Sequence, residues 1–174
     1  VLTCATNLGL AMVGARREDD TIRVVSNGEE VWCGASAALA SALLSSAPLS
    51  SAPGWTIYVE TVVARLRANF PGRLHGVDLA LASDVPRASG MSSSSALIIA
   101  LTATLAELNG LDHDPRWPMT ATDVAGYAAC IENGNDFGAL AGHTGVGTIG
   151  GAMDHTAMCG AQKGMLTCWS LAPT

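Results

Sequence analysis

The sequence predicts a fold of mixed strands and helices. Residues 21–25 and 76–84 alternate between apolar and polar or small side chains, a pattern typical of strands with one buried face. Residues 55–69 and 92–109 instead carry apolar side chains at helical spacing. Because both kinds of segment are interleaved within 174 residues and there is no internal repeat, we expect one mixed domain. The pattern does not determine the order of the strands.

The N-terminal part of the chain predicts strands joined by polar turns. Residues 1–15 alternate loosely and predict one strand, and the polar residues 16–20 predict a turn before the strand at 21–25. Asn27-Gly28 is a hairpin signal, because both residue types tolerate the left-handed backbone of a tight turn. Residues 30–33 then predict a third strand.

The middle of the chain predicts two helices with recognisable ends. Residues 41–53 are rich in Ala, Ser and Pro and predict a loop. The helix at residues 55–69 is expected to end before Pro71, because proline has no N–H to donate. The helix at 92–109 is expected to end at Gly110, since glycine readily adopts the left-handed conformation found at helix C-termini.

The C-terminal part predicts a further helix, a glycine-rich loop and a last strand. Thr120 or Thr122 can cap a helix that continues through Glu132. Residues 133–151 are rich in glycine and poor in charge, so we expect close backbone approach to a ligand or another segment rather than a flexible linker. Residues 163–169 predict the strand.

Composition and charge exclude several classes of protein. Nine Lys and Arg against 15 Asp and Glu give a formal net charge of −6, so the basic face that nucleic acid binding requires is missing. The longest apolar run, residues 96–106, is too short to span a bilayer, and no export signal is visible. The five cysteines form no Cys-x-x-Cys pair and are expected to be reduced core residues. We therefore expect a cytoplasmic protein with neither nucleic acid nor membrane as a partner.

A Gly- and Ser-rich segment joins the strand at residues 76–84 to the helix at 92–109. A strand that ends in such a loop and opens a helix can bind an anion, because the first-turn N–H groups are unpaired and the helix dipole favours negative charge. Gly90 allows close backbone approach, and the serines at 92–95 add hydroxyl groups that can also ligate Mg²⁺. A simpler alternative is that the serines only cap the helix and Gly90 only makes a tight turn.

Residues 86–96, Pro-Arg-Ala-Ser-Gly-Met-Ser-Ser-Ser-Ser-Ala, resemble the second motif of the GHMP kinases (galactokinase, homoserine, mevalonate and phosphomevalonate kinases). That motif reads Pro-x-x-x-Gly-Leu-(Gly/Ser)-Ser-Ser-Ala. Met91 replaces the Leu, and Ser95 stands where the family usually has Ala. The resemblance implies that the phosphates of ATP bind at Gly90, Ser92, Ser93 and Ser94.

Residues 150–155, Gly-Gly-Ala-Met-Asp-His, resemble the (Cys/Ser)-Gly-x-Met-Asp-Gln segment of galactokinases and related sugar kinases. The resemblance implies that Asp154 is the catalytic acid facing the sugar hydroxyl, and that Gly151 also belongs to the substrate site. His155 replaces the usual Gln or Asn. A carboxylate beside a hydroxyl can accept its proton during attack or orient it. The alternative is that Asp154 only caps a helix beginning at His155.

The end of the predicted helix at Glu132-Asn133 resembles the Ala-(x)n-Glu-Asn segment of galactokinases. In the family a Glu at this place can bind Mg²⁺ together with a serine of the second motif. The resemblance therefore implies Glu132 and Ser94 as metal ligands, with Ser93 as the alternative serine. The stretch from Glu132 to Asp154 is longer than in typical galactokinases, so Asp136 is an alternative acid for the metal.

Together these motifs imply the N-terminal, ATP-binding domain of a GHMP kinase, with an α+β fold similar to domain 2 of ribosomal protein S5. Residues 1–174 would form this domain, apparently incomplete at both ends, because the family's first and third motifs are not in the chain. The implied activity is ATP-dependent phosphorylation of a sugar hydroxyl, with Mg²⁺. The alternatives are a kinase for another small alcohol, or a sugar- and ATP-binding sensor with little turnover.

Two other enzyme classes are excluded by motif. No Gly-Lys-Ser/Thr sequence is present, and the only lysine, Lys163, lies far from the serines, which argues against a P-loop NTPase. A serine hydrolase would need Gly at the last position of the segment Gly90-Met-Ser-Ser-Ser94, and Ser94 stands there instead. The four histidines are not at metal-ligand spacing.

Overall fold

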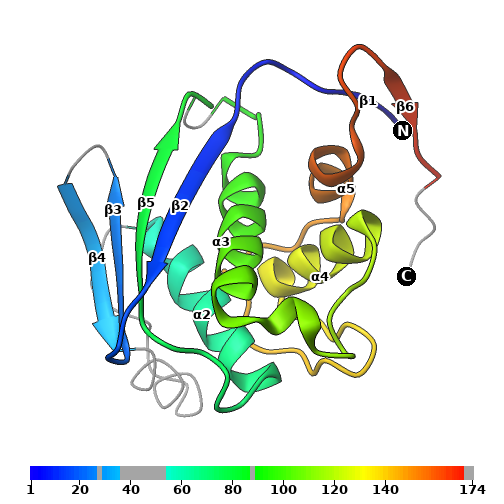
Figure 1. Ribbon diagram of the computed structural model, residues 1–174. Coiled ribbons are helices and arrows are strands. Elements are labelled where there is room, and N and C mark those ends of the chain that lie inside the picture. Colours follow the sequence, from blue (N-terminus) through cyan, green and yellow to red (C-terminus); the bar gives the residue numbers. More distant parts are fainter. Residues whose placement is uncertain (27–28, 36–53, 87–88, 171–174) are drawn as a thin grey trace.

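A four-stranded mixed sheet forms one layer of the molecule, in the order β2-β5-β3-β4 (Figure 1). The structure, a computed structural model, describes residues 1–26, 29–35, 54–86 and 89–170. The two central strands, β5 (Val77–Ser83) and β3 (Thr21–Ser26), run parallel. The outer strands, β2 (Leu10–Arg16) and β4 (Glu29–Ala35), run antiparallel to β5 and β3 respectively. Because β3 and β5 are parallel, the chain between them must cross over from one end of the sheet to the other. The helix α2 (Thr56–Asn69) lies within this crossover.

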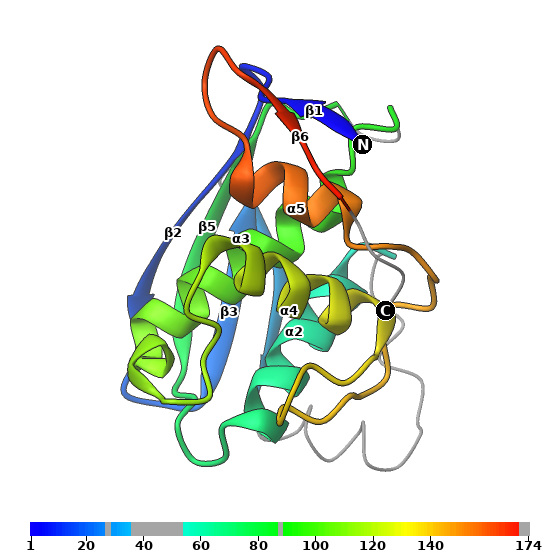
Figure 2. The same ribbon diagram turned by 90° about the vertical axis from the view of Figure 1, so that its right-hand side faces the viewer.

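The helices lie on one side of this sheet, as Figures 1 and 2 show. They are α2 (Thr56–Asn69), α3 (Ser93–Asn109), α4 (Ala121–Asn133) and α5 (Met153–Gly160), with a short 3₁₀ helix η1 (Leu111–His113) after α3. α3 is the central helix, because it packs against β2 on one side and against α2, α4 and α5 on the others. No helix in the described ranges is both long and apolar enough to cross a bilayer.

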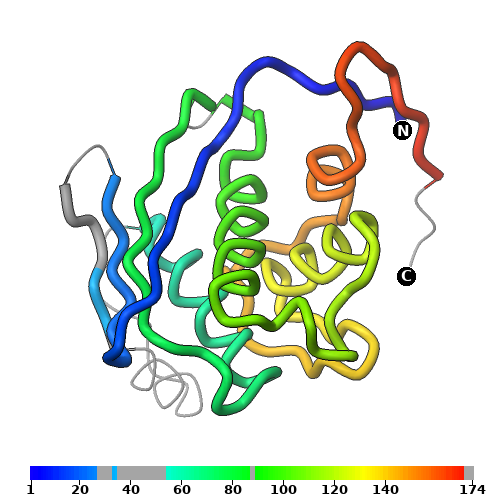
Figure 3. The backbone as a smooth tube through the Cα atoms, viewed as in Figure 1, coloured from blue at the N-terminus to red at the C-terminus, as the bar shows by residue number. Residues whose placement is uncertain are grey.

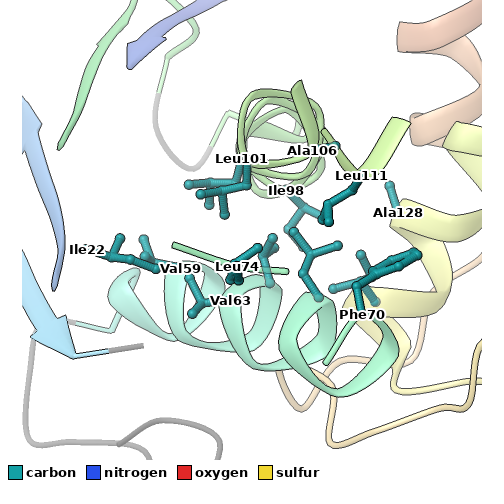
Figure 4. Packing of buried hydrophobic residues seen from close by; sticks show 14 of the residues in the cluster. Ile22, Val59, Val63, Phe70, Leu74, Ile98, Leu101, Ala106, Leu111 and Ala128 are labelled. Atoms are coloured by element: carbon teal, nitrogen blue, oxygen red, sulfur yellow. The ribbon is translucent and has the colours of Figure 1, made fainter. Parts of the chain in front are cut away.

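The hydrophobic core lies between the sheet and these helices (Figure 4). α3 contributes Ile98, Leu101 and Leu105, which recur at helical spacing and are fully buried. The sheet and α2 supply apolar side chains that meet them in the same cluster: Ile22, Val24, Val77, Leu79, Val59, Val63 and Leu66. Burial of such side chains is the main favourable term in folding.

The helices predicted from apolar spacing are confirmed. α2 ends at Asn69, before Pro71, and α3 is followed by Gly110 with φ of 62°. α4 begins after Thr120, whose hydroxyl accepts a hydrogen bond from the backbone N–H of Asp123. The Asp123 carboxylate in turn accepts from the N–H of Thr120, so of the two candidate caps it is Thr120 that serves, in a reciprocal capping box.

The single strand predicted for residues 1–15 is wrong, because this segment forms two strands in different sheets. β1 (Leu2–Cys4) pairs antiparallel with β6 (Leu166–Cys168), whereas β2 pairs with β5. Figure 3 follows the chain across from one sheet to the other. At the bend, the N–H of Gly9 donates to the carboxylate of Asp84. Alternation indicates a strand, but it does not identify the partner of each half.

The strands predicted on either side of the hairpin signal are present. Asn27-Gly28 itself lies outside the described residues, but β3 and β4 pair antiparallel with Ser26 opposite Glu29. The loop predicted at residues 41–53 also lies outside the described residues. The last predicted strand, at 163–169, is present as the shorter β6.

The expectation that the cysteines are core residues is wrong for three of the five. All five are free thiols, but Cys4, Cys33 and Cys168 are exposed and the other two are partly buried. Cys4 and Cys168 belong to the two-stranded ribbon β1–β6, which has too little structure around it to bury both faces. Cys33 lies on β4, an outer strand of the main sheet.

The glycine-rich loop between α4 and α5 folds back on the end of α4, as its composition predicts. The N–H of Val146 donates to the carbonyl of Glu132 at 2.9 Å, and the N–H of His143 donates to that of Gly134 at 3.1 Å. A Cβ atom at Gly145 would lie 2.4 Å from the carbonyl oxygen of Glu132, closer than side chains can come. Glycine is therefore required here by the approach of two backbone segments.

A buried arginine attaches this loop to α2. Arg65 is 1% exposed, and its guanidinium donates to the side-chain oxygen of Asn69 and to the backbone carbonyls of Asn135 and Leu140. The guanidinium carbon also lies 5.6 Å from the ring centroid of Tyr127 on α4. One side chain thus connects α2, α4 and the loop between α4 and α5.

Leu101→Ala is expected to lower the free energy of unfolding by about 2–5 kcal/mol, because it leaves a cavity where α3 meets the sheet and its neighbouring helices. Urea unfolding of the full-length protein measures the change. Leu166→Ala is the matched control, since this side chain is 74% exposed and its removal should change stability by less than about 0.5 kcal/mol. Equal losses for the two variants would contradict the packing described here.

Gly145→Ala is expected to cost about 1–3 kcal/mol of stability, because the added methyl group collides with backbone atoms at the end of α4. Thermal unfolding compared with Gly9→Ala tests this, since a Cβ at Gly9 meets no atom within 4 Å and its φ is not positive. A Gly145→Ala variant that melts with the wild type would show that the loop does not rest on α4.

Candidate active site

The serine-rich segment enters α3 through an unusual backbone conformation. Gly90 has φ of 75°, and Ser92, the residue before α3, has φ of 53°. Ser92 is the one non-glycine residue with positive φ in the part of the chain that the structure describes. A side chain in this conformation costs of the order of 1–3 kcal/mol and persists only where surrounding contacts hold it.

The side chain of Ser92 does not cap α3. Its hydroxyl makes no hydrogen bond to the first turn of the helix and instead donates to the carboxylate of Asp154, in a short contact. The simpler alternative, in which the serines only cap the helix, is therefore wrong for the residue at the cap position. The contact brings together residues 62 positions apart in sequence, at the meeting of α3 and α5.

Asp154 is half-buried in the first turn of α5. This helix begins at Met153 with Ala152 before it, so Asp154 lies inside the helix and does not cap it. The alternative role as a cap for a helix beginning at His155 is therefore wrong. A carboxylate in a first turn is favoured by the helix dipole.

Glu132 lies near the C-terminal end of α4 and is 8% exposed. Its Oε2 atom accepts a hydrogen bond from the hydroxyl of Ser95 at 3.1 Å and lies 3.0 Å from Nε2 of His155. Burial by itself raises the pKa of Glu132, but the nearby His155 and the hydroxyls of Ser95 and Ser94 outweigh it. The pKa is therefore below its ordinary value, and Glu132 is held as a carboxylate.

These side chains surround a polar pocket of about 240 Å³. Its wall contains Ser94, Glu132, Gly151 and Asp154, which are four of the residues that the sequence motifs single out. The remaining lining comes from the loop before α5 and from both helices: Ser95, Asn133, Thr148, Gly150, Met153 and His155. Two carboxylates and several hydroxyl groups thus face one space.

A second pocket, of about 280 Å³, lies on the other side of the serines. Trp55 and Tyr58 provide aromatic surface, and aliphatic residues and serines contribute equally to the rest of its wall: Leu10, Ser26, Leu81, Ser83, Val85, Ser93, Ser94 and Leu97. Ser94 lines both pockets, so the start of α3 separates an apolar space from the polar one.

The structure brings most of the predicted site residues together. Ser92 reaches the polar pocket through its contact with Asp154, and Ser93 faces the apolar pocket only. Gly90 is exposed in the loop and lines neither pocket. The alternative acid Asp136 also lines neither, and its carboxylate accepts a hydrogen bond from the N–H of Gly142 within the glycine-rich loop.

Three side chains that make polar contacts at the polar pocket were not predicted as site residues. Ser95 and His155 contact Glu132, and the side-chain oxygen of Asn133 accepts a hydrogen bond from the N–H of Gly150 at 2.6 Å. A signal existed for the first two, because Ser95 and His155 are the positions at which this sequence departs from the motifs it resembles. Their shared contact was not visible from the sequence.

The donor atoms of the polar pocket suit a hard divalent cation. Glu132 and Ser94 supply a carboxylate and a hydroxyl that line the same pocket, and oxygen ligands of this kind are those Mg²⁺ prefers. Within the described ranges, no three His, Cys, Asp or Glu side chains are grouped to hold a metal ion by themselves. Mg²⁺ commonly binds through one or two protein oxygens together with substrate phosphates, so the residues present fit this ion.

Comparisons with known proteins show similarity to galactokinases. The chain is 29% identical over 133 residues to a galactokinase of Pasteurella multocida, and 31% identical over 135 residues to one of Actinobacillus pleuropneumoniae. Each match covers 76% of this chain and 31% of the relative, so the chain spans about a third of their length. The crystal structure of Lactococcus lactis galactokinase complexed with galactose resembles the fold with a TM-score of 0.66 at 18% identity. That match covers 91% of this chain and 36% of the other.

The family model described as the GHMP kinases N terminal domain matches residues 57–161, which is more than half of the chain. The matched region begins in α2, contains the serine-rich segment and Glu132, and ends directly after α5. The expected α+β fold is thus confirmed, and the chain belongs to the GHMP kinase family through its N-terminal domain.

Proposed function

We propose that this chain is the nucleotide- and cation-binding part of an ATP-dependent kinase that phosphorylates a sugar hydroxyl. The observation that carries the proposal is the contact between Ser92 and Asp154, which sets a carboxylate beside the first turn of the serine-led helix α3. The similarity to galactokinases supports a sugar as the acceptor. The polar pocket supports the chemistry, because Ser94, from the serine-rich start of α3, and the carboxylate of Asp154 both line it.

The phosphates of ATP would bind at the start of α3. Gly90 leaves the loop backbone free of a side chain, and the first turn of α3 has N–H groups that the Ser92 side chain does not occupy. Ser93 and Ser94 add hydroxyl donors, one on the apolar pocket and one on both pockets. The apolar pocket with Trp55 and Tyr58 would take the adenine ring, since aromatic side chains stack on bases.

Mg²⁺ would be held by Ser94 and Glu132 together with the phosphates. When bound there, the ion would offset negative charge on the transferring phosphoryl group. Glu132 is suited to this role, because the low pKa of its buried carboxyl keeps it charged near neutral pH. Ser94 lies between the two pockets, which is where a ligand spanning both would carry its phosphates.

Asp154 would face the acceptor hydroxyl. It can accept the proton of that hydroxyl as the oxygen attacks, or orient it and stabilise the developing charge. The hydroxyl of Ser92 would hold the carboxylate in position. Gly151 precedes Asp154 by three residues and lines the same pocket. A Cβ at Gly151 would meet no protein atom within 4 Å, which leaves space for a substrate. Positioning of this kind supplies much of the catalysis in phosphoryl transfer.

The proposal is tested by ADP release from the full-length protein with ATP, Mg²⁺ and a panel of sugars and small alcohols. Galactose heads the panel, because the similar proteins are galactokinases. Turnover with a sugar supports the proposal, and turnover with a non-sugar alcohol alone would replace the acceptor class. Tight binding of sugar and ATP without ADP release would instead indicate a sensor.

Asp154→Ala and Asp154→Asn are expected to lower kcat by about 10²–10⁴-fold, because both remove the proton acceptor. ATP binding, measured by calorimetry, should remain as in the wild type. Asp112→Asn is the control, since this exposed acid lies in η1, at the opposite end of α3 from Ser92. Near-normal turnover by either Asp154 variant would refute the catalytic assignment.

Trp55→Ala is expected to weaken ATP binding by about tenfold, because the adenine ring loses an aromatic surface in the apolar pocket. Binding of inorganic tripolyphosphate is the matched control, since it has no base and should bind the variant as it binds the wild type. Equal losses for ATP and tripolyphosphate would place the adenine ring elsewhere.

A further inference from the structure

His155 is a buried polar residue for which packing alone provides no reason. Its side chain is 2% exposed, and neither Nδ1 nor Nε2 makes a hydrogen bond of good geometry to the described residues. An unpaired buried nitrogen costs stability that an apolar side chain of similar size would avoid. Nε2 does lie 3.0 Å from Oε2 of Glu132, at ion-pair distance. The one polar contact that His155 makes is therefore with the acid of the polar pocket.

The contacts of Glu132 are divided unequally between its two oxygens. Ser95 donates to Oε2 from α3, and His155 reaches the same atom from α5. Because Ser95 and His155 both meet this oxygen, rotation of the carboxylate would break the hydrogen bond from Ser95 and separate the close contact with His155. The other oxygen, Oε1, receives neither of these contacts, and the carboxylate lines the pocket that Ser94 and Asp154 also face.

His155 also connects the two acids of the pocket. It directly follows Asp154 in the first turn of α5, and the two consecutive side chains contact different partners, Ser92 on α3 and Glu132 on α4. A shift of α5 would therefore disturb both carboxylates at once. The relative position of the acids depends on the first turn of this helix.

We propose that His155 is a positioning residue that holds the Glu132 carboxylate, by donating from Nε2 to Oε2, in the orientation needed to bind a divalent cation with a nucleoside phosphate. This inference rests on the proposed function, in which Glu132 is a ligand of that cation. Partners that orient a metal ligand typically change metal affinity by about 10–100-fold when they are removed.

The test compares two substitutions of similar length in the full-length protein. His155→Gln keeps an N–H donor, and His155→Met removes it. Binding of Mn²⁺ in the presence of ADP, read from the electron paramagnetic resonance signal of free Mn²⁺, requires no turnover. His155→Met is expected to weaken Mn²⁺ binding by about tenfold, and His155→Gln is expected to restore most of it. In assays, His155→Met should raise the Mg²⁺ concentration for half-maximal rate more than it lowers kcat at saturating Mg²⁺.

Two controls separate positioning from stability. His113→Met changes an exposed histidine, with 84% of its side chain accessible, in η1 and should leave Mn²⁺ binding unchanged. His155→Leu is a second donor-free variant with a different shape, in case His155→Met does not fold. Melting temperatures of all variants accompany the binding data.

Three results would overturn the inference. Wild-type Mn²⁺ affinity in the folded donor-free variant would show that Glu132 does not need the donor. Equal losses in His155→Gln and His155→Met would show that ring shape matters instead. These two results leave the proposed function intact, provided the wild type releases ADP with a sugar. Absence of Mn²⁺-dependent ADP binding in the wild type would refute the proposed cation site, and this inference with it.

Discussion

The burial of α3 is the constraint on which the candidate site depends. This helix packs against β2 and against the other three α-helices of the described ranges, with Ile98, Leu101 and Leu105 fully enclosed. Because the apolar side chains hold the body of the helix, its serine-rich N-terminal turn has a defined place beside α4 and α5. Ser92 and Ser95 can then each contact a carboxylate from another helix. A less securely packed helix would not bring hydroxyls to acids that follow it by some 40 to 60 residues.

The site concentrates features that cost stability. Ser92 has a left-handed backbone, Glu132 is a buried carboxylate, and the buried ring of His155 makes no hydrogen bond of good geometry to the described residues. Each is individually unfavourable, and each could be removed by a residue that packs as well. Their occurrence around one pocket is typical of functional sites, where positioning of polar groups takes precedence over stability.

The glycine-rich loop explains how Glu132 and Asp154 can act together although a long irregular segment separates them. Its backbone lies directly on the end of α4, at Gly145, and Asn133 binds the N–H of Gly150 just before α5. Arg65 attaches the middle of the loop to α2 through backbone carbonyls. The loop is therefore part of the packed structure, and its length does not loosen the relation between the two acids.

The helices and the candidate acids could be recognised from the sequence, because the relevant signals are local. Apolar spacing and end residues such as Thr120 and Gly110 act within one or two turns, and the motifs around Ser94, Glu132 and Asp154 are short. The order of the strands and the division of residues 1–15 between two sheets depend on pairing with distant segments. Local alternation carries no information on such partners.

The same distinction holds within the site. The sequence by itself determined that a serine-led helix and two acids occur in a pattern resembling a kinase. Only the tertiary structure decided that Ser92 holds Asp154 rather than capping α3, and that Ser95 and His155 meet at one oxygen of Glu132. Such contacts join three helices, so they depend on how the helices pack around the core, and no single segment of the sequence specifies them.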